Sequence, residues 1–290
     1  MKILCIDIGG TNTKYSLFDN ETPSKIKSIP TPPGLKIEDM KKCIFPIVDE
    51  TIKLVGKLDF ISISTCGQMR DNKVLFTSSK PGYIGCDWKE ILWNKYKIPC
   101  VANNDLHCAV MGEYHYGLSK TDIPDNFICL SIGTGINIST IINGNIFTGD
   151  GNLSCYLDNM TDLDGNNQFK SASTASLLKL YKAESGIDLD GKQFIDLLKT
   201  EDDLSLKCYK IWINRIAHIL KNVLYMFNIN VITACGGILN SNYPILDDVK
   251  SELIKIAAPP YCEYLNLTKS KLSSSQIYGA YAFAMKELNK

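Results

Sequence analysis

Short apolar runs separated by glycine-containing turns recur along the chain. Residues 3–6 and 15–18 flank one such turn, and residues 127–130 and 136–142 repeat the arrangement later in the sequence. Apolar, β-branched runs of this length around a tight turn predict strands joined as hairpins. Two similar units far apart in one chain indicate an internal duplication, and we expect two half-domains that face each other.

Longer segments carry their apolar positions at helical spacing. They include residues 36–56, 88–97, 174–185, 191–200, 203–228, 245–256 and 275–288. Because they alternate with strand-like runs, the pattern predicts an α/β fold. The apolar stripe of residues 203–228 is either core or a dimer face, and core is the simpler interpretation. Residues 143–173 are polar and form the longest predicted loop, which in a compact domain is often functional.

The first glycine-containing turn concentrates polar chemistry. Its residues are Asp7, Ile8, Gly9, Gly10, Thr11, Asn12, Thr13 and Lys14. The simplest interpretation is a plain hairpin whose glycines allow positive φ where a side chain would clash. Backbone N–H groups and hydroxyls at such a turn also form an anion site, to which a lysine adds charge. The Asp at the end of the first strand is then placed to hold Mg²⁺ through water beside a phosphate.

Two further glycine turns strengthen the interpretation as a phosphate site. Gly133, Thr134 and Gly135 lie between the strands of the second hairpin. Gly236 and Gly237 follow a strand-like run at residues 231–235, and we expect a helix after them. A strand that leads into a helix through glycines is a common place for backbone to approach a nucleotide. Three such turns together are more specific than any one.

Asn104 and Asp105 end a predicted strand and open a helix. One interpretation is helix capping, and we expect that one of the two residues does cap. The other is that a carboxylate at the carboxyl end of a strand points into the crevice where ligands of α/β folds bind. The sequence weights the two interpretations equally.

Composition excludes several classes of protein. The 290 residues carry zero formal net charge, so there is no electrostatic footprint for nucleic acid or an anionic membrane. No apolar run approaches the roughly 20 residues that span a bilayer, and the N-terminus is too short in apolar residues for a signal peptide. The eleven cysteines include no CxxC pair. We interpret them as reduced core residues, and expect a cytosolic protein without a leading helix-turn-helix segment.

The motifs occur in an order and spacing that resemble the ROK family of repressors, open reading frames and sugar kinases. That family belongs to the actin/hexokinase ATPase superfamily, and the resemblance runs through almost the whole chain. It rests on the Asp7 turn, Asn103-Asn104-Asp105, Ile132-Gly133-Thr134-Gly135 and Cys235-Gly236-Gly237-Ile238. It implies two ribonuclease-H-like domains around a central cleft that closes on sugar and ATP. We expect residues 1–117 with 276–290 in one domain and 118–275 in the other.

The resemblance also implies roles for individual residues. Asp105 would be the catalytic base, and Asp7 would sit near Mg²⁺. The sugar-binding residues would be Ser64, Gly67, Asn104, Asp105, Asn152 and Cys155. The ATP-binding residues would be Asp7, Gly9, Gly10, Thr11, Asn12, Lys14, Gly133, Thr134, Gly135, Gly236 and Gly237. Phosphoryl transfer depends mainly on positioning and charge neutralisation, which these residue types supply.

One segment departs from the family pattern. The family usually has a Gly-Glu-x-Gly-His segment and a cysteine run that binds zinc with that His. Here Asn152 stands for the Glu and Cys155 for the His, and residues 158–170 contain no cysteine. We therefore expect no zinc. Zinc-less relatives include kinases of N-acetylmannosamine and of glucosides, and N-acetylmannosamine is the leading substrate.

Several functions remain open at this stage. The leading one is an ATP- and Mg²⁺-dependent kinase of the 6-hydroxyl of a hexose or N-acetylhexosamine, with glucokinase and β-glucoside kinase as variants. The second is a sugar-sensing member that transfers no phosphate, which the altered Glu and His positions keep open. An acyl or small-alcohol kinase is weaker, because Asn104-Asp105 matches the sugar motif. Relatives are often dimers, so we expect a homodimer.

Overall fold

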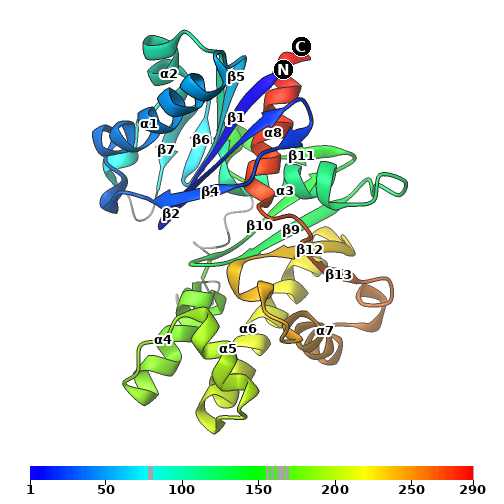
Figure 1. Ribbon diagram of the computed structural model, residues 1–290. Helices are drawn as coiled ribbons and strands as arrows, with labels where there is room; N and C mark the ends of the chain where they lie inside the picture. The colour runs from blue at the N-terminus through cyan, green and yellow to red at the C-terminus, as the bar shows by residue number, and fades with distance from the viewer. Residues whose placement is uncertain (78–80, 155–156, 158–159, 162–166, 168–169, 290) are drawn as a thin grey trace. The chain divides into compact units, whose positions relative to one another are not determined.

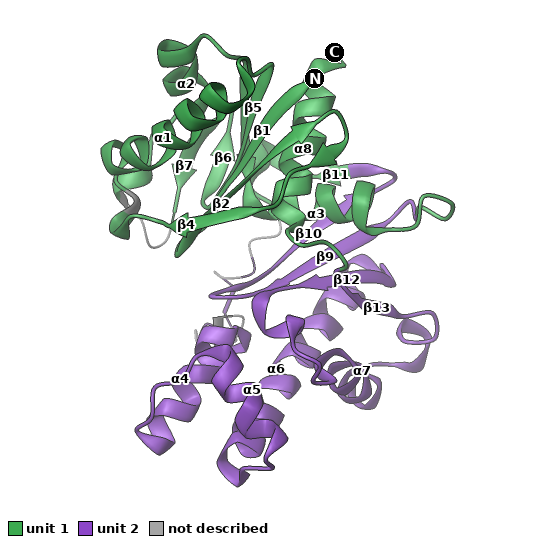
Figure 2. Cartoon of the chain, in the orientation of Figure 1, with its two compact units in different colours: residues 1–123, 146–154, 271–290 green, residues 124–145, 155–270 purple. Residues whose placement is uncertain are grey.

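The computed structural model describes residues 1–77, 81–154, 157, 160–161, 167 and 170–289. The chain divides into two compact units. Unit 1 comprises residues 1–123, 146–154 and 271–290, and unit 2 comprises residues 124–145 and 155–270 (Figure 2). The domain limits expected at 117/118 and 275/276 stay a prediction.

The sheet of unit 1 is built around its first hairpin. Its strands, in the order β3-β2-β1-β5-β8 with β4 also paired to β2, are β1 (Lys2–Ile8), β2 (Asn12–Asp19), β3 (Thr22–Pro23), β4 (Lys27–Pro30), β5 (Phe60–Thr65) and β8 (Cys100–Asn104). β1 pairs antiparallel with β2 and parallel with β5, and β5 pairs parallel with β8. The carboxyl ends of β1, β5 and β8 therefore meet at one edge of the sheet.

Helices cover both faces of this sheet (Figure 1). The helices of unit 1 are α1 (Ile37–Val55), α2 (Trp88–Tyr96), α3 (Asp105–Gly112) and α8 (Ser275–Leu288). Apolar side chains of α1 and α2 pack on one face, with Met40, Ile44 and Leu92 fully buried. α8 packs on the other face beside α3, which continues as a π-helical turn over Glu113–Gly117.

Unit 2 repeats the strand plan. Its sheet has the order β11-β10-β9-β12-β13, made of β9 (Phe127–Ile132), β10 (Ile136–Ile142), β11 (Asn145–Phe147), β12 (Val231–Cys235) and β13 (Asn266–Lys269). Residues 146 and 147 of β11 are counted with unit 1. β9 pairs antiparallel with β10 and parallel with β12, as β1 does with β2 and β5. The prediction of two strand–glycine–strand units in one α/β chain is confirmed.

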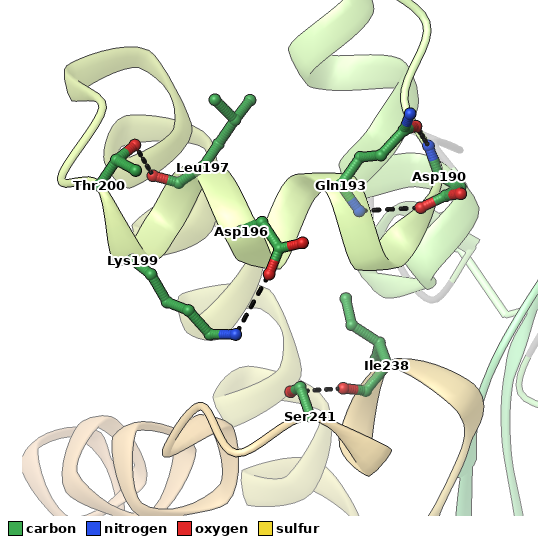
Figure 3. Close-up of polar contacts among 8 residues, drawn as sticks. All are labelled: Asp190, Gln193, Asp196, Leu197, Lys199, Thr200, Ile238 and Ser241. Atoms are coloured by element: carbon green, nitrogen blue, oxygen red, sulfur yellow. Dashed lines mark hydrogen bonds and ion pairs between the residues drawn. The ribbon is translucent and has the colours of Figure 1, made fainter.

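One continuous core holds unit 2 together. Its helices are α4 (Thr174–Ser185), α5 (Gly191–Lys199), α6 (Asp203–Phe227) and α7 (Ile245–Ile256). The stripe of α6 predicted at 203–228 is buried, with Trp212, Ile216 and Leu220 fully inaccessible. α5 begins with a capping box, in which the side chains of Asp190 and Gln193 bond each other's backbone N–H (Figure 3).

Two local expectations were wrong. Gly9 and Gly10 do not have positive φ, so the first hairpin turn does not need glycine for that reason. The run after Gly236 is the short 3-10 turn η7 (Gly237–Asn240) rather than a helix, because polar turn residues and Pro244 follow at once. Ser241 closes that turn by donating to the Ile238 carbonyl (Figure 3).

The structure also adds strands where the sequence predicted loop. β6 (Gln68–Arg70) and β7 (Lys73–Phe76) form a hairpin directly after Gly67, and β6 was not predicted. β11 lies within the polar stretch 143–173. Across the described part of the chain, no helix combines the length and apolarity needed to span a membrane.

Candidate functional site

Asp7 lies at the carboxyl end of β1, between residues of the two neighbouring strands. It pairs in register with Lys14 on β2 and with Ser64 on β5. The Ser64 hydroxyl donates to Asp7 Oδ1 over 2.8 Å. Only 7% of Asp7 is exposed. The sheet register thus brings a carboxylate, a hydroxyl and a lysine together at this edge.

Burial controls the protonation of Asp7. Removal from water raises its pKa from 3.8 to about 6, although the Ser64 hydrogen bond and the charge of Lys14 both lower it. The carboxylate is therefore ionised at neutral pH without full compensation of its charge. A cation beside it would supply that compensation, so Asp7 is chemically suited to a hydrated divalent ion.

The turn after Asp7 is shaped by backbone contacts. Gly9 N–H donates to the Asn12 carbonyl over 3.1 Å, and a Cβ on Gly9 would lie 2.8 Å from that oxygen. Gly10, Thr11 and Asn12 are exposed. The tip of the hairpin therefore presents backbone and short polar side chains to solvent.

Asn104 and Asp105 share the start of α3. Asn104 Oδ1 accepts from the N–H groups of Leu106 and His107, so Asn104 is the helix cap and the expectation that one of the two residues caps is confirmed. Its Nδ2 donates to the Gly67 carbonyl over 2.7 Å. An amide nitrogen carries two hydrogens, so one of them is still available to a ligand. Asp105 is half-exposed and accepts from Leu106 N–H.

Cys108 lies near the carboxylates of Asp7 and Asp105, and it was not among the residues predicted from the sequence. Its buried thiol lies on α3, and the nearby Ser64 hydroxyl lowers its pKa. Burial raises its pKa well above the usual range, and the charges of Asp7 and Asp105 add to that effect. Both carboxylates are thus within electrostatic reach of one side chain. No spacing rule in the sequence predicted this arrangement.

The Gly67 loop lies next to the segment that contains Asn152. Gly67 has φ of 97°, and a Cβ there would lie 3.0 Å from the Phe76 carbonyl, so glycine is required. β6, which follows, contacts the turn η4 (Asp150–Asn152). An atom at the Cβ position of Gly151 would lie 3.2 Å from Arg70 Nη1. Arg70 was not among the predicted site residues.

Unit 2 brings its two glycine turns together. Gly236 has φ of 151°, and a Cβ there would lie 1.9 Å from the Ile132 carbonyl oxygen. Gly133 N–H donates to the Gly135 carbonyl over 2.8 Å, while Thr134 and Gly237 are exposed. The backbone of the two turns is therefore in direct contact, which only a glycine at position 236 permits.

Two helices support these turns. At the start of α4, Thr174 N–H donates to the Gly133 carbonyl over 2.9 Å. The hydroxyl of Thr174 is buried and has no hydrogen-bond partner among the described residues. α5 contacts η7, the turn that follows Gly236. The start of α4 thus supports the turn at residues 133–135, and α5 supports the turn that follows Gly236.

Each unit gathers part of the predicted site. Unit 1 brings together Asp7, Lys14, Ser64, Gly67, Asn104 and Asp105, with Asn152 beside β6. Unit 2 brings together Gly133, Thr134, Gly135, Gly236 and Gly237. Cys155 lies outside the described residues. Among the described residues, no cluster of three or more His, Cys, Asp or Glu side chains is arranged to hold a metal ion.

Comparison with known sequences identifies related proteins. The model of the ROK family matches residues 3–155 and 170–287. An uncharacterized protein of Clostridium perfringens is 26% identical over 98% of both chains. The xylose repressor of Bacillus subtilis is 26% identical over 63% of this chain and 49% of its own length. An N-acetylmannosamine kinase of Salmonella agona is 26% identical over 54% of this chain and 53% of its own length.

Solved structures share the fold along the whole chain. A ROK family glucokinase from Streptomyces griseus, in complex with glucose and AMPPNP, has a TM-score of 0.86 at 18% identity and covers 99% of this chain and 100% of its own. A ROK family protein from Streptococcus pneumoniae, in complex with sucrose, has a TM-score of 0.82 at 25% identity and covers 100% and 99%. The expected fold class, two ribonuclease-H-like domains of the actin-like ATPase type, is confirmed.

Proposed function

We propose that this chain, which belongs to the ROK family, is an ATP-dependent kinase that phosphorylates the 6-hydroxyl of a hexose or N-acetylhexosamine. The leading substrate is N-acetylmannosamine, in keeping with the kinase of that sugar among the relatives. The observation that carries the proposal is the parallel register of β1, β5 and β8, which brings Asp7, Ser64 and Asn104, with Asp105 next in the chain, to one edge of the sheet.

Asp105 is the proposed catalytic base. It lies at the first position of α3, where the Asn104 cap holds the helix start against the Gly67 loop. An ionised carboxylate accepts the proton of the attacking hydroxyl in this class of reaction. Asn104, Gly67, Ser64 and Asn152 are the proposed sugar contacts of unit 1. Cys155 stays a proposed sugar contact on the resemblance alone.

Asp7 is the proposed Mg²⁺ ligand, acting through water. Its buried and incompletely compensated charge fits a hydrated divalent cation. Bound Mg²⁺ supplies charge neutralisation to the phosphates of ATP. Gly9, Gly10, Thr11, Asn12 and Lys14 form the proposed first phosphate turn. Gly133, Thr134 and Gly135 form the second, and Gly236 with Gly237 meets the adenosine.

Other properties belong to the proposal as well. The protein functions without zinc, in the cytoplasm, as a homodimer. Dialysis against a zinc-selective chelator followed by metal analysis tests the first, and the mass in solution at several concentrations tests the last. Retained activity without zinc and a dimeric mass are the expected results.

A non-catalytic sugar sensor is the second candidate. It is favoured by the match to a xylose repressor and by Asn152, whose amide replaces the carboxylate of the family's sugar motif. The deciding measurement is ADP release with Mg²⁺·ATP and N-acetylmannosamine, N-acetylglucosamine, glucose, mannose, fructose or a β-glucoside. Sugar-dependent ADP release supports the kinase. Sugar binding without ADP release from any of them supports the sensor.

A further inference from the structure

Arg70 places a permanent positive charge beside the proposed sugar loops. The strand β6 begins one residue after Gly67, and its side chains alternate so that Met69 is buried while Gln68 and Arg70 share the other face. The guanidinium lies against Gly151, which precedes Asn152. The charge therefore lies where two segments proposed to contact sugar meet within unit 1.

The Arg70 side chain is exposed. Among the residues that the structure describes, no ion pair or hydrogen bond involves the Arg70 side chain. Neither Asp71, the next residue in the chain, nor Asp150 of η4 forms an ion pair with it. The sequence contains one other arginine, Arg215, whose Nη1 donates to the Ser171 carbonyl. Arg70 is thus exposed and open to an acceptor from outside.

The chemistry of the surrounding groups narrows what that acceptor is. A guanidinium presents paired N–H donors that match the oxygens of a carboxylate, sulfate or phosphate. Asn104, which bonds the Gly67 carbonyl, and Asn152, which follows Gly151, carry neutral amides that hydrogen-bond to hydroxyls. Three residues of strand from Gly67 to Arg70 span about 10 Å, a length that a sugar ring with one substituent covers.

We propose that Arg70 selects an anionic sugar: a hexose derivative that keeps its 6-hydroxyl and carries a carboxylate or sulfate on another ring position. This inference rests on the proposed function, because it places Arg70 in the same sugar site. Arg70 forms a bidentate contact with the acidic substituent, while Asn104 and Asn152 bind neutral hydroxyls. Loss of the family's Glu at position 152 removes a negative charge that would repel such a substrate.

The test compares matched sugars by calorimetry with the intact protein. N-acetylglucosamine is the neutral member, N-acetylmuramic acid carries a carboxylate, and glucosamine N-sulfate carries a sulfate. All three keep the 6-hydroxyl. The expected result is that at least one acidic sugar binds about tenfold or more tightly than the neutral one. High salt should reduce that advantage, because the contact is exposed.

Variants of the hairpin identify the residue responsible. Arg70→Gln should abolish the advantage of the acidic sugar and leave the neutral sugar within about twofold, whereas Arg70→Lys should retain part of it. Lys73→Gln is the matched control, because it removes a positive charge from an exposed position on the neighbouring strand β7. An equal loss for both sugars in Arg70→Gln would contradict the proposal, as would a neutral sugar that binds as well as both acidic ones.

ADP release on the same sugars separates this inference from the proposed function. Acidic sugars that bind through Arg70 without ADP release would support the inference and overturn the kinase. Neutral sugars that are phosphorylated with no preference for acidic ones would support the kinase and overturn the inference. Absence of detectable binding of both acidic sugars also overturns it.

Discussion

The two units share a strand plan but differ in the residues at corresponding positions. In unit 1, Asp7 ends β1 and pairs with Lys14 and Ser64. In unit 2, Ser131 occupies the corresponding place on β9 and pairs with Asn137 and Cys235. The same sheet register therefore collects charged groups in one unit and neutral groups in the other.

The difference indicates that the two units, although they share a strand plan, contribute different kinds of groups to the candidate site. Unit 1 holds its polar groups through side-chain contacts, such as Ser64 to Asp7 and Asn104 to Gly67. Unit 2 relies on backbone approach, with Gly236 against the Ile132 carbonyl. A side chain with a pKa near neutrality suits proton and metal chemistry, whereas bare backbone suits close contact with a ligand. Four sets of substitutions test this contrast.

The largest expected effect is on turnover in Asp105→Asn. Removing a general base lowers the rate by about 10²–10⁴-fold, so we expect ADP release to fall by about a thousandfold while sugar binding is retained. The measurement pairs steady-state ADP release with calorimetric sugar binding. Asp247→Asn, in the first turn of α7 in unit 2, is the control and should keep full activity. Equal turnover in Asp105→Asn would remove Asp105 from the chemistry.

Glycine-to-alanine substitutions should lower the free energy of unfolding more in the turn of unit 2 than in the turn of unit 1. Gly236→Ala puts a Cβ 1.9 Å from the Ile132 carbonyl oxygen, and we expect a loss of about 2–4 kcal/mol in unfolding free energy. Gly9→Ala meets the Asn12 carbonyl at 2.8 Å and should cost about 1–2 kcal/mol. Gly10→Ala meets nothing within 4 Å and should stay within about 0.5 kcal/mol. Urea unfolding of the three variants measures this order, and the reverse order would contradict the proposed reliance of unit 2 on backbone contact.

Asp7→Asn should lose catalytic activity and gain free energy of unfolding. The pKa of Asp7 is raised to about 6 in the folded protein, so its ionisation destabilises the fold as pH rises from about 4 to about 6. The amide carries no charge, and we expect a gain of about 1–2 kcal/mol at pH 8 and none at pH 4, with loss of Mg²⁺-dependent turnover.

Urea unfolding of this variant at both pH values checks the prediction. Asp19→Asn, which removes a carboxylate from the exposed end of β2, is the control. A stability gain that is the same at pH 4 and pH 8 would show that the charge of Asp7 is not its source.

The smallest expected effect is a pH shift in Ser64→Ala. The Ser64 hydrogen bond lowers the pKa of Asp7, so its removal should move the acid limb of the activity profile from about 6 to higher pH. Ser62→Ala is the control, because Ser62 lies on the same strand and bonds the Ala280 carbonyl instead. The profile of ADP release against pH is measured for both variants. An acid limb that does not shift in Ser64→Ala would show that the ionisation of Asp7 does not cause that limb.

Much of the fold followed from local patterns. The hairpins, the buried stripe of α6 and the closing helix α8 were predicted because apolar spacing reports which face of an element is buried. The η7 turn and β6 were missed because short elements carry too few periodic positions. The positive φ expected at Gly9 and Gly10 was wrong because glycine permits that conformation without requiring it.

For the candidate site, the sequence by itself determined the residue types at the strand ends: the Asp7 turn, Asn104 with Asp105, and the two glycine turns of unit 2. Only the tertiary structure decided their neighbours. The charge of Asp7 on β1 acts on Cys108 on α3, Arg70 lies against Gly151, and Gly236 meets Ile132. Each of these contacts joins residues on different elements. Sheet order and register bring them together, and those depend on packing of the whole unit rather than on any local pattern.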